Sequence, residues 1–218
     1  ALQRNDDADR AKSQFAEDVS IPEKFRASLK DYHRSGYDRG HLVPAADAKI
    51  TQQAMDETFI LTNITPQVGK GFNRDCAYAC STFAEVYVFT GPLYLPDPVT
   101  KEVRYKTIGN GDPSSLVAVP THFYKVILAV GGRGEPQAIG GFVVPNAPIQ
   151  DGARLDAFAV DVDYIERASG LEFFDRLDKK RIAHLCKKVK CVAMPTRHHI
   201  KQLEAAAAVK SLPEMSRI

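Results

Sequence analysis

Runs of apolar residues separated by glycine and proline turns predict most of the secondary structure of this chain. Along the middle of the sequence these runs are short and rich in Val, Ile, Tyr and Phe, a pattern typical of strands. The strands predicted in this way cover residues 85–90, 103–108, 116–119, 121–127 and 139–144. A sheet of mostly antiparallel strands is therefore expected.

Three segments have the features of helices, in addition to the one near Asn73 described below. Residues 51–56 form a short helix whose first turn Thr51 can cap, and residues 162–168 form a longer one that Gly170 can end. A third helix is predicted over residues 177–186. Helices that flank a mostly antiparallel sheet make the expected fold class α+β.

The region before the long sheet alternates strand, loop and helix. One strand carries His41, residues 59–62 form another, and Pro66 is expected to end that second strand because proline cannot donate to the ladder. A helix then begins near Asn73. The length of 218 residues suits one domain, predicted over residues 21–200, with a charged extension at 1–20 and a tail at 201–218.

The tetrapeptide Asp38-Arg39-Gly40-His41 is the segment richest in candidate chemistry. An imidazole titrates near neutral pH and suits a general base, whereas a guanidinium stays charged and grips phosphate oxygens. Asp38 could orient the arginine or the loop. Taken alone, the tetrapeptide is also an ordinary turn sequence, so the pattern indicates phosphodiester chemistry only together with its neighbours.

Those neighbours make the chain resemble the DNA/RNA non-specific endonucleases, and within them mitochondrial endonuclease G and its fungal relatives. The resemblance rests on the run from Tyr37 to Asp75 and on residues 90–96 and 119–123, which follow in the family's order. It implies a ββα-metal nuclease fold and hydrolysis of both DNA and RNA. It also implies Mg²⁺ as cofactor with Mn²⁺ as a plausible substitute, a homodimer and a mitochondrial location.

The resemblance also assigns roles to residues. It makes His41 the general base, Arg39 the arginine near the phosphate, Asn63 a supporting residue of the catalytic site and Asn73 the metal's only direct protein ligand. Asp38 and Arg74 are expected to contact substrate.

Simpler interpretations stay open for several of these residues. Asn73 could be a helix N-cap, Asn63 could close a local turn, and His122 is better explained as a hydrogen-bonded core histidine than as a second base. Residues 76–82 are also shorter than the family's helix, and Ser81 stands near the place of a family glutamate. The alternative function is therefore a catalytically impaired nucleic-acid-binding module of the same fold.

The net charge and the cysteine content add little to the functional interpretation of the sequence. The formal net charge of +2 does not by itself indicate a polyanionic partner, although basic residues gather in several clusters. The four cysteines are Cys76, Cys80, Cys186 and Cys191. They suit reduced thiols or a local bridge between the last two better than a zinc site. No apolar run is long enough for a membrane anchor, and no signal segment is expected.

Overall fold

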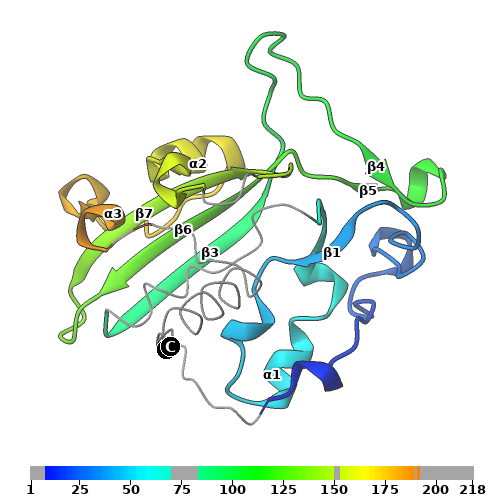
Figure 1. Ribbon diagram of the computed structural model, residues 1–218, viewed down its shortest axis with the longest axis horizontal. Helices are drawn as coiled ribbons and strands as arrows, with labels where there is room; N and C mark the ends of the chain where they lie inside the picture. The colour runs from blue at the N-terminus through cyan, green and yellow to red at the C-terminus, as the bar shows by residue number, and fades with distance from the viewer. Residues whose placement is uncertain (1–7, 70–82, 150–152, 190, 192–218) are drawn as a thin grey trace, which may run out of the picture.

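The structure is a computed structural model that describes residues 8–69, 83–149, 153–189 and 191. Its largest element is a five-stranded sheet in the order β3-β6-β7-β8, with β9 pairing with β7 (Figure 1). The strands are β3 (Glu85–Leu93), β6 (His122–Val130), β7 (Pro136–Pro145), β8 (Ala159–Val160) and β9 (Ala183–His184). All pairings in this sheet are antiparallel except that of β9 with β7.

Two small antiparallel ribbons lie outside this sheet. One pairs β1 (Asp38–His41) with β2 (Ile64–Gln67), and the other pairs β4 (Thr107–Ile108) with β5 (Val117–Ala118). The α-helices are α1 (Gln52–Glu57), α2 (Val162–Ser169) and α3 (Leu185–Lys188). The 3-10 turns are η1 (Arg10–Lys12), η2 (Glu23–Phe25), η3 (Ala45–Asp47), η4 (Leu61–Asn63), η6 (Pro113–Ser115), η7 (Leu155–Phe158) and η8 (Lys179–Arg181). This arrangement confirms the expected α+β class with a mostly antiparallel sheet.

The central strand β6 is buried on both faces because its apolar residues alternate between two cores. Val126 and Leu128 pack with Ile165 of α2 on one face. Ile127 and Ala129 pack with Leu185 of α3 on the other. Successive side chains of a strand point to opposite faces, so a continuous apolar run of this kind can fill both cores.

Local capping explains why two predicted helices form where expected. The Thr51 side chain accepts a hydrogen bond from the Ala54 backbone N–H, which caps α1. At the other end of α2, Gly170 adopts the left-handed conformation at φ 72° and ends the helix.

The helix predicted over residues 177–186 is wrong. The chain there makes η8, then β9, then the single turn α3. Ala183 and His184 pair in parallel with Ala138 and Ile139 of β7, and this long-range pairing overrides the local helical pattern.

The strand predicted over residues 59–62 is also wrong. Residues Leu61–Asn63 form η4, and the strand begins at Ile64 and continues through Pro66, which lies opposite Arg39. A proline is tolerated because β2 pairs with β1 alone in a two-stranded ribbon. The opposite edge of β2 is tied by Asn146, whose Nδ2 donates to Pro66 O at 3.0 Å and whose Oδ1 accepts from Val68 N at 2.9 Å.

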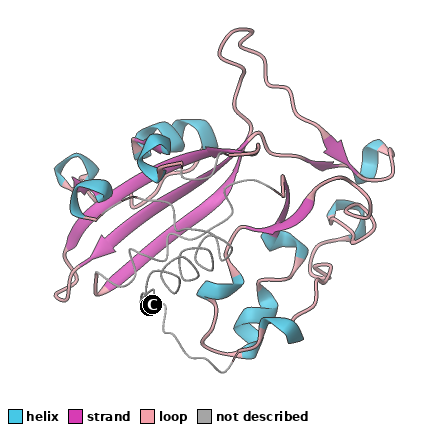
Figure 2. Cartoon of the chain, in the orientation of Figure 1, coloured by secondary structure: helices cyan, strands magenta, loops and turns pink. Residues whose placement is uncertain are grey.

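The strand predicted over residues 103–108 is reduced to Thr107–Ile108. Residues before it belong to a long loop that projects from the body of the molecule (Figure 2). Val103 and Tyr105 are about half exposed there. Alternating apolar residues need a partner strand to become a strand, and within the described residues this segment pairs only at its end.

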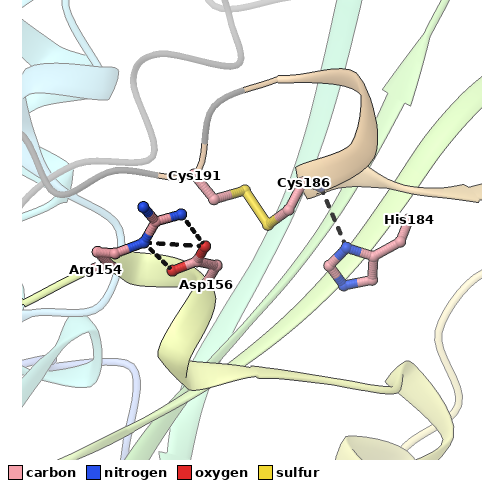
Figure 3. Close-up of a disulfide and its surroundings, with 5 residues drawn as sticks. All are labelled: Arg154, Asp156, His184, Cys186 and Cys191. Atoms are coloured by element: carbon pink, nitrogen blue, oxygen red, sulfur yellow. Dashed lines mark hydrogen bonds and ion pairs between the residues drawn. A yellow bond between two sulfur atoms is a disulfide. The ribbon is translucent and has the colours of Figure 1, made fainter.

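A disulfide joins Cys186 to Cys191, one of the two states expected for this pair (Figure 3). It closes the turn around α3, whose N-terminus is capped by His184 Nδ1, which accepts from the Cys186 N–H at 3.2 Å. These two cysteines are therefore unavailable to the four-cysteine zinc site considered above. Cys76 and Cys80 lie outside the described residues.

Residues 9–16 pack against the ribbon and α1. Ala16 forms a parallel bridge with Ile60, donating to Phe59 O at 3.2 Å and accepting from Leu61 N at 2.8 Å. The proposed domain boundaries at residues 20 and 200 stay predictions, but this segment is in close contact with the residues around His41. No helix in the described part of the chain is both long and apolar enough to cross a bilayer.

Candidate active site

The β1–β2 ribbon presents the tetrapeptide in an extended conformation. Arg39 lies opposite Pro66 and His41 lies opposite Ile64. Because side chains two positions apart in a strand share a face, Arg39 and His41 are directed to the same side of the ribbon. The base and the phosphate ligand expected from the sequence are thus brought together.

Gly40 is needed between them for a steric reason. A Cβ atom at this position would lie 1.8 Å from the Gln67 side chain, which crosses β1 and is buried. Any other residue would force the buried Gln67 side chain out of its place. The glycine therefore fixes the ribbon that carries both functional side chains.

Two phenylalanine rings from distant parts of the chain lie against the candidate base. The His41 ring centre lies 4.6 Å from that of Phe59, nearly perpendicular to it, and 5.6 Å from that of Phe15. The two phenylalanine centres are 5.0 Å apart. Edge-to-face and tilted contacts at these distances are favourable for aromatic pairs. The imidazole is therefore held against an apolar surface rather than projecting freely into water.

This environment sets the protonation state of His41. Burial, and after it the positive charge of Arg10, lower its pKa from the ordinary 6.5 to about 4. His41 is therefore neutral at pH 7. Its Nε2 atom is buried and has no hydrogen-bond partner among the described residues. A neutral imidazole keeps one unprotonated ring nitrogen, which can accept a proton.

The Arg39 guanidinium lies over the face of Phe15, with Cζ 4.3 Å from the ring centre. A planar guanidinium stacks on an aromatic ring while its edges remain able to donate hydrogen bonds. Arg39 is exposed, so an anion can reach it. Phe15 therefore orients the arginine and shields the histidine at the same time.

Asn63 holds the backbone that follows His41. Its Oδ1 accepts from Val43 N at 3.0 Å, and its Nδ2 donates to Val43 O at 3.0 Å and to Thr58 O at 2.8 Å. Its own carbonyl accepts from Leu42 N at 2.9 Å. Two of the three amide bonds go to Val43, twenty residues earlier in the chain, and the third goes to Thr58, five residues earlier, so the amide does more than close a local turn. These contacts fit the supporting role that the resemblance implies.

The other predicted site residues are placed only in part. Asp38 lies at the start of β1 with its carboxylate against Gly69, where a Cβ would come within 2.6 Å of Asp38 Oδ2. Asn73 and Arg74 lie outside the described residues. Within the described ranges no three His, Cys, Asp or Glu side chains gather as they would around a metal ion.

His122 belongs to the main sheet. It is half-buried at the start of β6, and its Nδ1 lies 3.0 Å from Thr121 Oγ1. Burial lowers the pKa of His122 as well. A partly buried, hydrogen-bonded histidine is what the sequence led us to expect at this position.

Arg10, Phe15 and Phe59 were not identified as site residues from the sequence. Phe15 and Arg10 precede His41 by some thirty residues in a polar stretch without periodicity, and Phe59 was assigned to a strand. The only available signal was an isolated aromatic residue in a charged segment, which is weak because isolated exposed aromatic residues are common.

Comparisons with known proteins agree with this geometry. Residues 1–180 match the sequence profile of the DNA/RNA non-specific endonuclease family. The chain is 46% identical to the mitochondrial nuclease of Saccharomyces cerevisiae, over 94% of this chain and 67% of that protein. It is 49% identical to nuclease 1, mitochondrial, of Schizosaccharomyces pombe, over 82% and 59%.

A structural relative points the same way. A chain in the crystal structure of the EndoG/EndoGI complex superposes with a TM-score of 0.73 at 41% identity, covering 83% of this chain and 76% of the other. The chain spans about three fifths to two thirds of the length of the curated relatives named above. With a family match over most of its length and relatives at this level of identity, the chain belongs to the DNA/RNA non-specific endonuclease family, whose ββα-metal fold implies a divalent metal ion.

Proposed function

We propose that this chain is a sugar-non-specific endonuclease that hydrolyses phosphodiester bonds of DNA and RNA, with Mg²⁺ as its ion and Mn²⁺ as a substitute. The observation that carries the proposal is the pairing of two groups on one face of β1. One is a neutral imidazole held against Phe59 and Phe15, and the other is a guanidinium stacked on Phe15.

In the proposed reaction His41 removes a proton from a water molecule as the water oxygen attacks phosphorus. The new bond joins the water oxygen to phosphorus, and the bond between phosphorus and the 3′ oxygen breaks; the 3′ oxygen leaves with the bonding electrons and takes a proton from solvent water. Arg39 donates hydrogen bonds to the non-bridging phosphate oxygens and holds the phosphate in place. Because His41 is neutral at pH 7, it needs no prior deprotonation.

Asn73 is the residue proposed to hold the metal ion. When bound, such an ion supplies charge neutralisation at the phosphate and at the leaving oxygen. What supports Asn73 in this role is the resemblance to the family, in whose motif it stands at the place of the metal-binding asparagine. One protein oxygen can suffice because Mg²⁺ retains several waters and also binds substrate phosphate.

The expected substrates follow from the type of contact. A guanidinium on a phosphate reads neither base nor sugar, so both DNA and RNA should be cut with little sequence preference. The names of several relatives include the word mitochondrial, and we propose the same location for this protein. We also propose a homodimer, which light scattering would contradict by giving the mass of a single chain.

The alternative is a nucleic-acid-binding module of the same fold with impaired catalysis. What favours it is the short stretch after Asn73, with Ser81 near the place of a glutamate in the family. Loss of a residue that supports a metal ligand typically costs about 10 to 100 fold in metal affinity or activity. The two candidates therefore differ in turnover rather than in binding.

Plasmid nicking in Mg²⁺, with and without a chelator, separates the two. The nuclease should convert supercoiled to open-circular DNA only when the ion is present, whereas the impaired module should bind the plasmid equally well but nick it at least about 10 to 100 fold more slowly. His41→Ala should lower the cleavage rate by roughly 10² to 10⁴ fold, the usual loss for a general base, with binding nearly unchanged. If His41→Ala cut as fast as the natural protein, the assignment of the base would be wrong.

A further inference from the structure

In the part of the chain that the structure describes, side chains rather than another strand hold the free edge of β2. Backbone groups of a strand alternate between its two edges, so those of residues 64, 66 and 68 point away from β1. The Ile64 carbonyl accepts from the Tyr32 hydroxyl at 3.3 Å. The Pro66 carbonyl and the Val68 N–H both bond to the side chain of Asn146, at 3.0 and 2.9 Å. Asn146 therefore occupies the place that a third strand would take.

The Asn146 side chain suits this edge because a carboxamide carries the same donor and acceptor as a peptide group. Its Oδ1 accepts from the Val68 N–H while its Nδ2 donates to the Pro66 carbonyl, as a peptide group of a neighbouring strand would do. The Nδ2 atom also donates to the Pro120 carbonyl at 2.9 Å. The amide oxygen and both amide hydrogens are therefore engaged, which fixes the orientation of the side chain.

Asn146 is itself fixed to the main sheet. It follows β7 directly, and its backbone N–H donates to the Thr121 carbonyl at 2.9 Å, which extends the β6–β7 pairing by one residue. This end of the sheet lies on the side of the β1–β2 ribbon (Figure 1). Among the described residues, Asn146 makes all the hydrogen bonds that join residues 64–68 to the chain beyond residue 83. One side chain thus joins the ribbon to the sheet.

The two bonded positions lie between the groups of the proposed reaction. Pro66 is opposite Arg39 in the pairing of β1 with β2. Val68 is the first residue after β2, and Asn73 follows five residues later in the sequence. Without the bonds to Asn146, a displacement of this edge of β2 would move Arg39 and the start of the segment that leads to Asn73.

We propose that Asn146 is a positioning residue of the active site. Its side chain holds the ribbon that carries Arg39 and His41, and the start of the segment that leads to Asn73, in one place on the main sheet. The inference rests on the proposed nuclease function and deepens it. Asn146 acts through Pro66 and Val68 rather than by contact with the phosphate.

The test compares Asn146→Ala with Thr121→Val. Asn146→Ala removes the three side-chain bonds that join the ribbon to the sheet. Thr121→Val is the matched control, because the Thr121 hydroxyl accepts from Leu95 N at 2.8 Å and donates to Leu93 O at 3.1 Å. These bonds lie at the same end of the sheet but do not reach the ribbon. Both variants should lose stability, and only Asn146→Ala should alter the site.

The first readout is DNA cleavage, measured well below the melting temperatures of both variants. Asn146→Ala should lower kcat by roughly 10² fold, the loss expected when reacting groups are misplaced by about 1 Å. It should also raise the Mg²⁺ concentration needed for half-maximal cleavage. Thr121→Val should keep both quantities at their natural values. An unchanged kcat in Asn146→Ala, or the same loss of kcat in both variants, would overturn the proposal.

The second readout needs no catalysis. In metal-free Asn146→Ala, the backbone amides of residues 38–41 and 64–68 should exchange hydrogen faster than in the natural protein or in Thr121→Val. Affinity for uncleaved duplex DNA in chelator should fall because Arg39 is displaced, and the log-log salt slope should decrease by about 0.9, the value for one lost phosphate contact. Unchanged exchange and affinity would contradict the role of Asn146. If the natural protein cleaves nothing, the proposed nuclease function fails, and these two measurements still decide that role.

A second substitution guards against a folding defect. If Asn146→Ala does not fold, Asn146→Asp replaces it, because this change keeps the size of the side chain and the acceptor for the Val68 N–H but removes both amide donors. A stably folded Asn146→Asp should also lower kcat, and natural turnover in this variant would contradict the proposal.

Discussion

Removing Phe15 should raise the pKa of His41 and shift the pH range in which the base works. In the natural protein burial is the largest cause of the low pKa of His41, about 4, and the Phe15 ring lies 5.6 Å from the imidazole. Phe15→Ala lets water reach the imidazole, so the pKa should move toward the ordinary value of 6.5. Phe15 is only half-buried, and the fold should survive the change.

The effect is large enough to measure at mildly acidic pH. At pH 5.5 a base with a pKa near 4 is almost entirely neutral, whereas one with a pKa of 6.5 is neutral in only about a tenth of the molecules. The acid limb of kcat/KM, which reports the free enzyme, should therefore move to higher pH in Phe15→Ala. The same change should appear when the imidazole C–H resonance of His41 is titrated in metal-free protein.

The pH dependence of folding stability provides an independent test of the lowered pKa of His41. A histidine whose folded pKa is depressed resists protonation in the folded state, so the natural protein should lose stability as pH falls from about 6.5 toward 4. Phe15→Ala should show less of this loss. Phe25→Ala is the matched control, because Phe25 is 72% exposed and its recorded ring contact is with Lys24. The reasoning is refuted if the natural acid limb already lies near 6.5, or if both phenylalanine variants behave alike.

Three further predictions concern the metal ligand, the second histidine and the disulfide. Asn73→Ala should raise the Mg²⁺ concentration needed for half-maximal cleavage, because it removes the proposed inner-sphere oxygen; an unchanged requirement in a magnesium titration rules out the ligand role. His122→Ala should lower the melting temperature while the folded protein keeps cleaving, and loss of cleavage at an unchanged melting temperature would make His122 a candidate base instead. Cys186→Ser opens a loop whose ends are five positions apart, which by the chain-entropy model costs about 2 kcal/mol, or roughly 4–8 °C in melting temperature. Calorimetry of oxidised protein against the variant checks this value, and equal melting temperatures would show that the bridge adds no stability.

Local signals explain the elements that the sequence predicted well. The helix at α1 follows from Thr51 and the end of α2 from Gly170, because a cap acts within one turn of the residue that provides it. The long apolar runs of β6 and β7 were recognisable because both faces of these strands are buried. At β9, pairing with the distant strand β7 decides the secondary structure, and the local helical pattern gave the wrong prediction.

The same division holds for the active site. From Asp38 to His41 the residue types, read together with the neighbouring motifs, indicate a base and a phosphate ligand, because imidazole and guanidinium chemistry are properties of the side chains themselves. The steric need for Gly40 is different. It arises from Gln67, which lies across the ribbon and could not be identified before β1 and β2 were paired.

The sequence by itself therefore determined the family, the fold class and the identity of the candidate base and phosphate ligand. Only the tertiary structure decided the pKa of that base. The pKa of His41 depends on burial against Phe15 and Phe59 and on the charge of Arg10. Desolvation and Coulomb interactions depend on distances in space. Residues 10, 15, 41 and 59 are far apart along the chain, and folding alone brings them together.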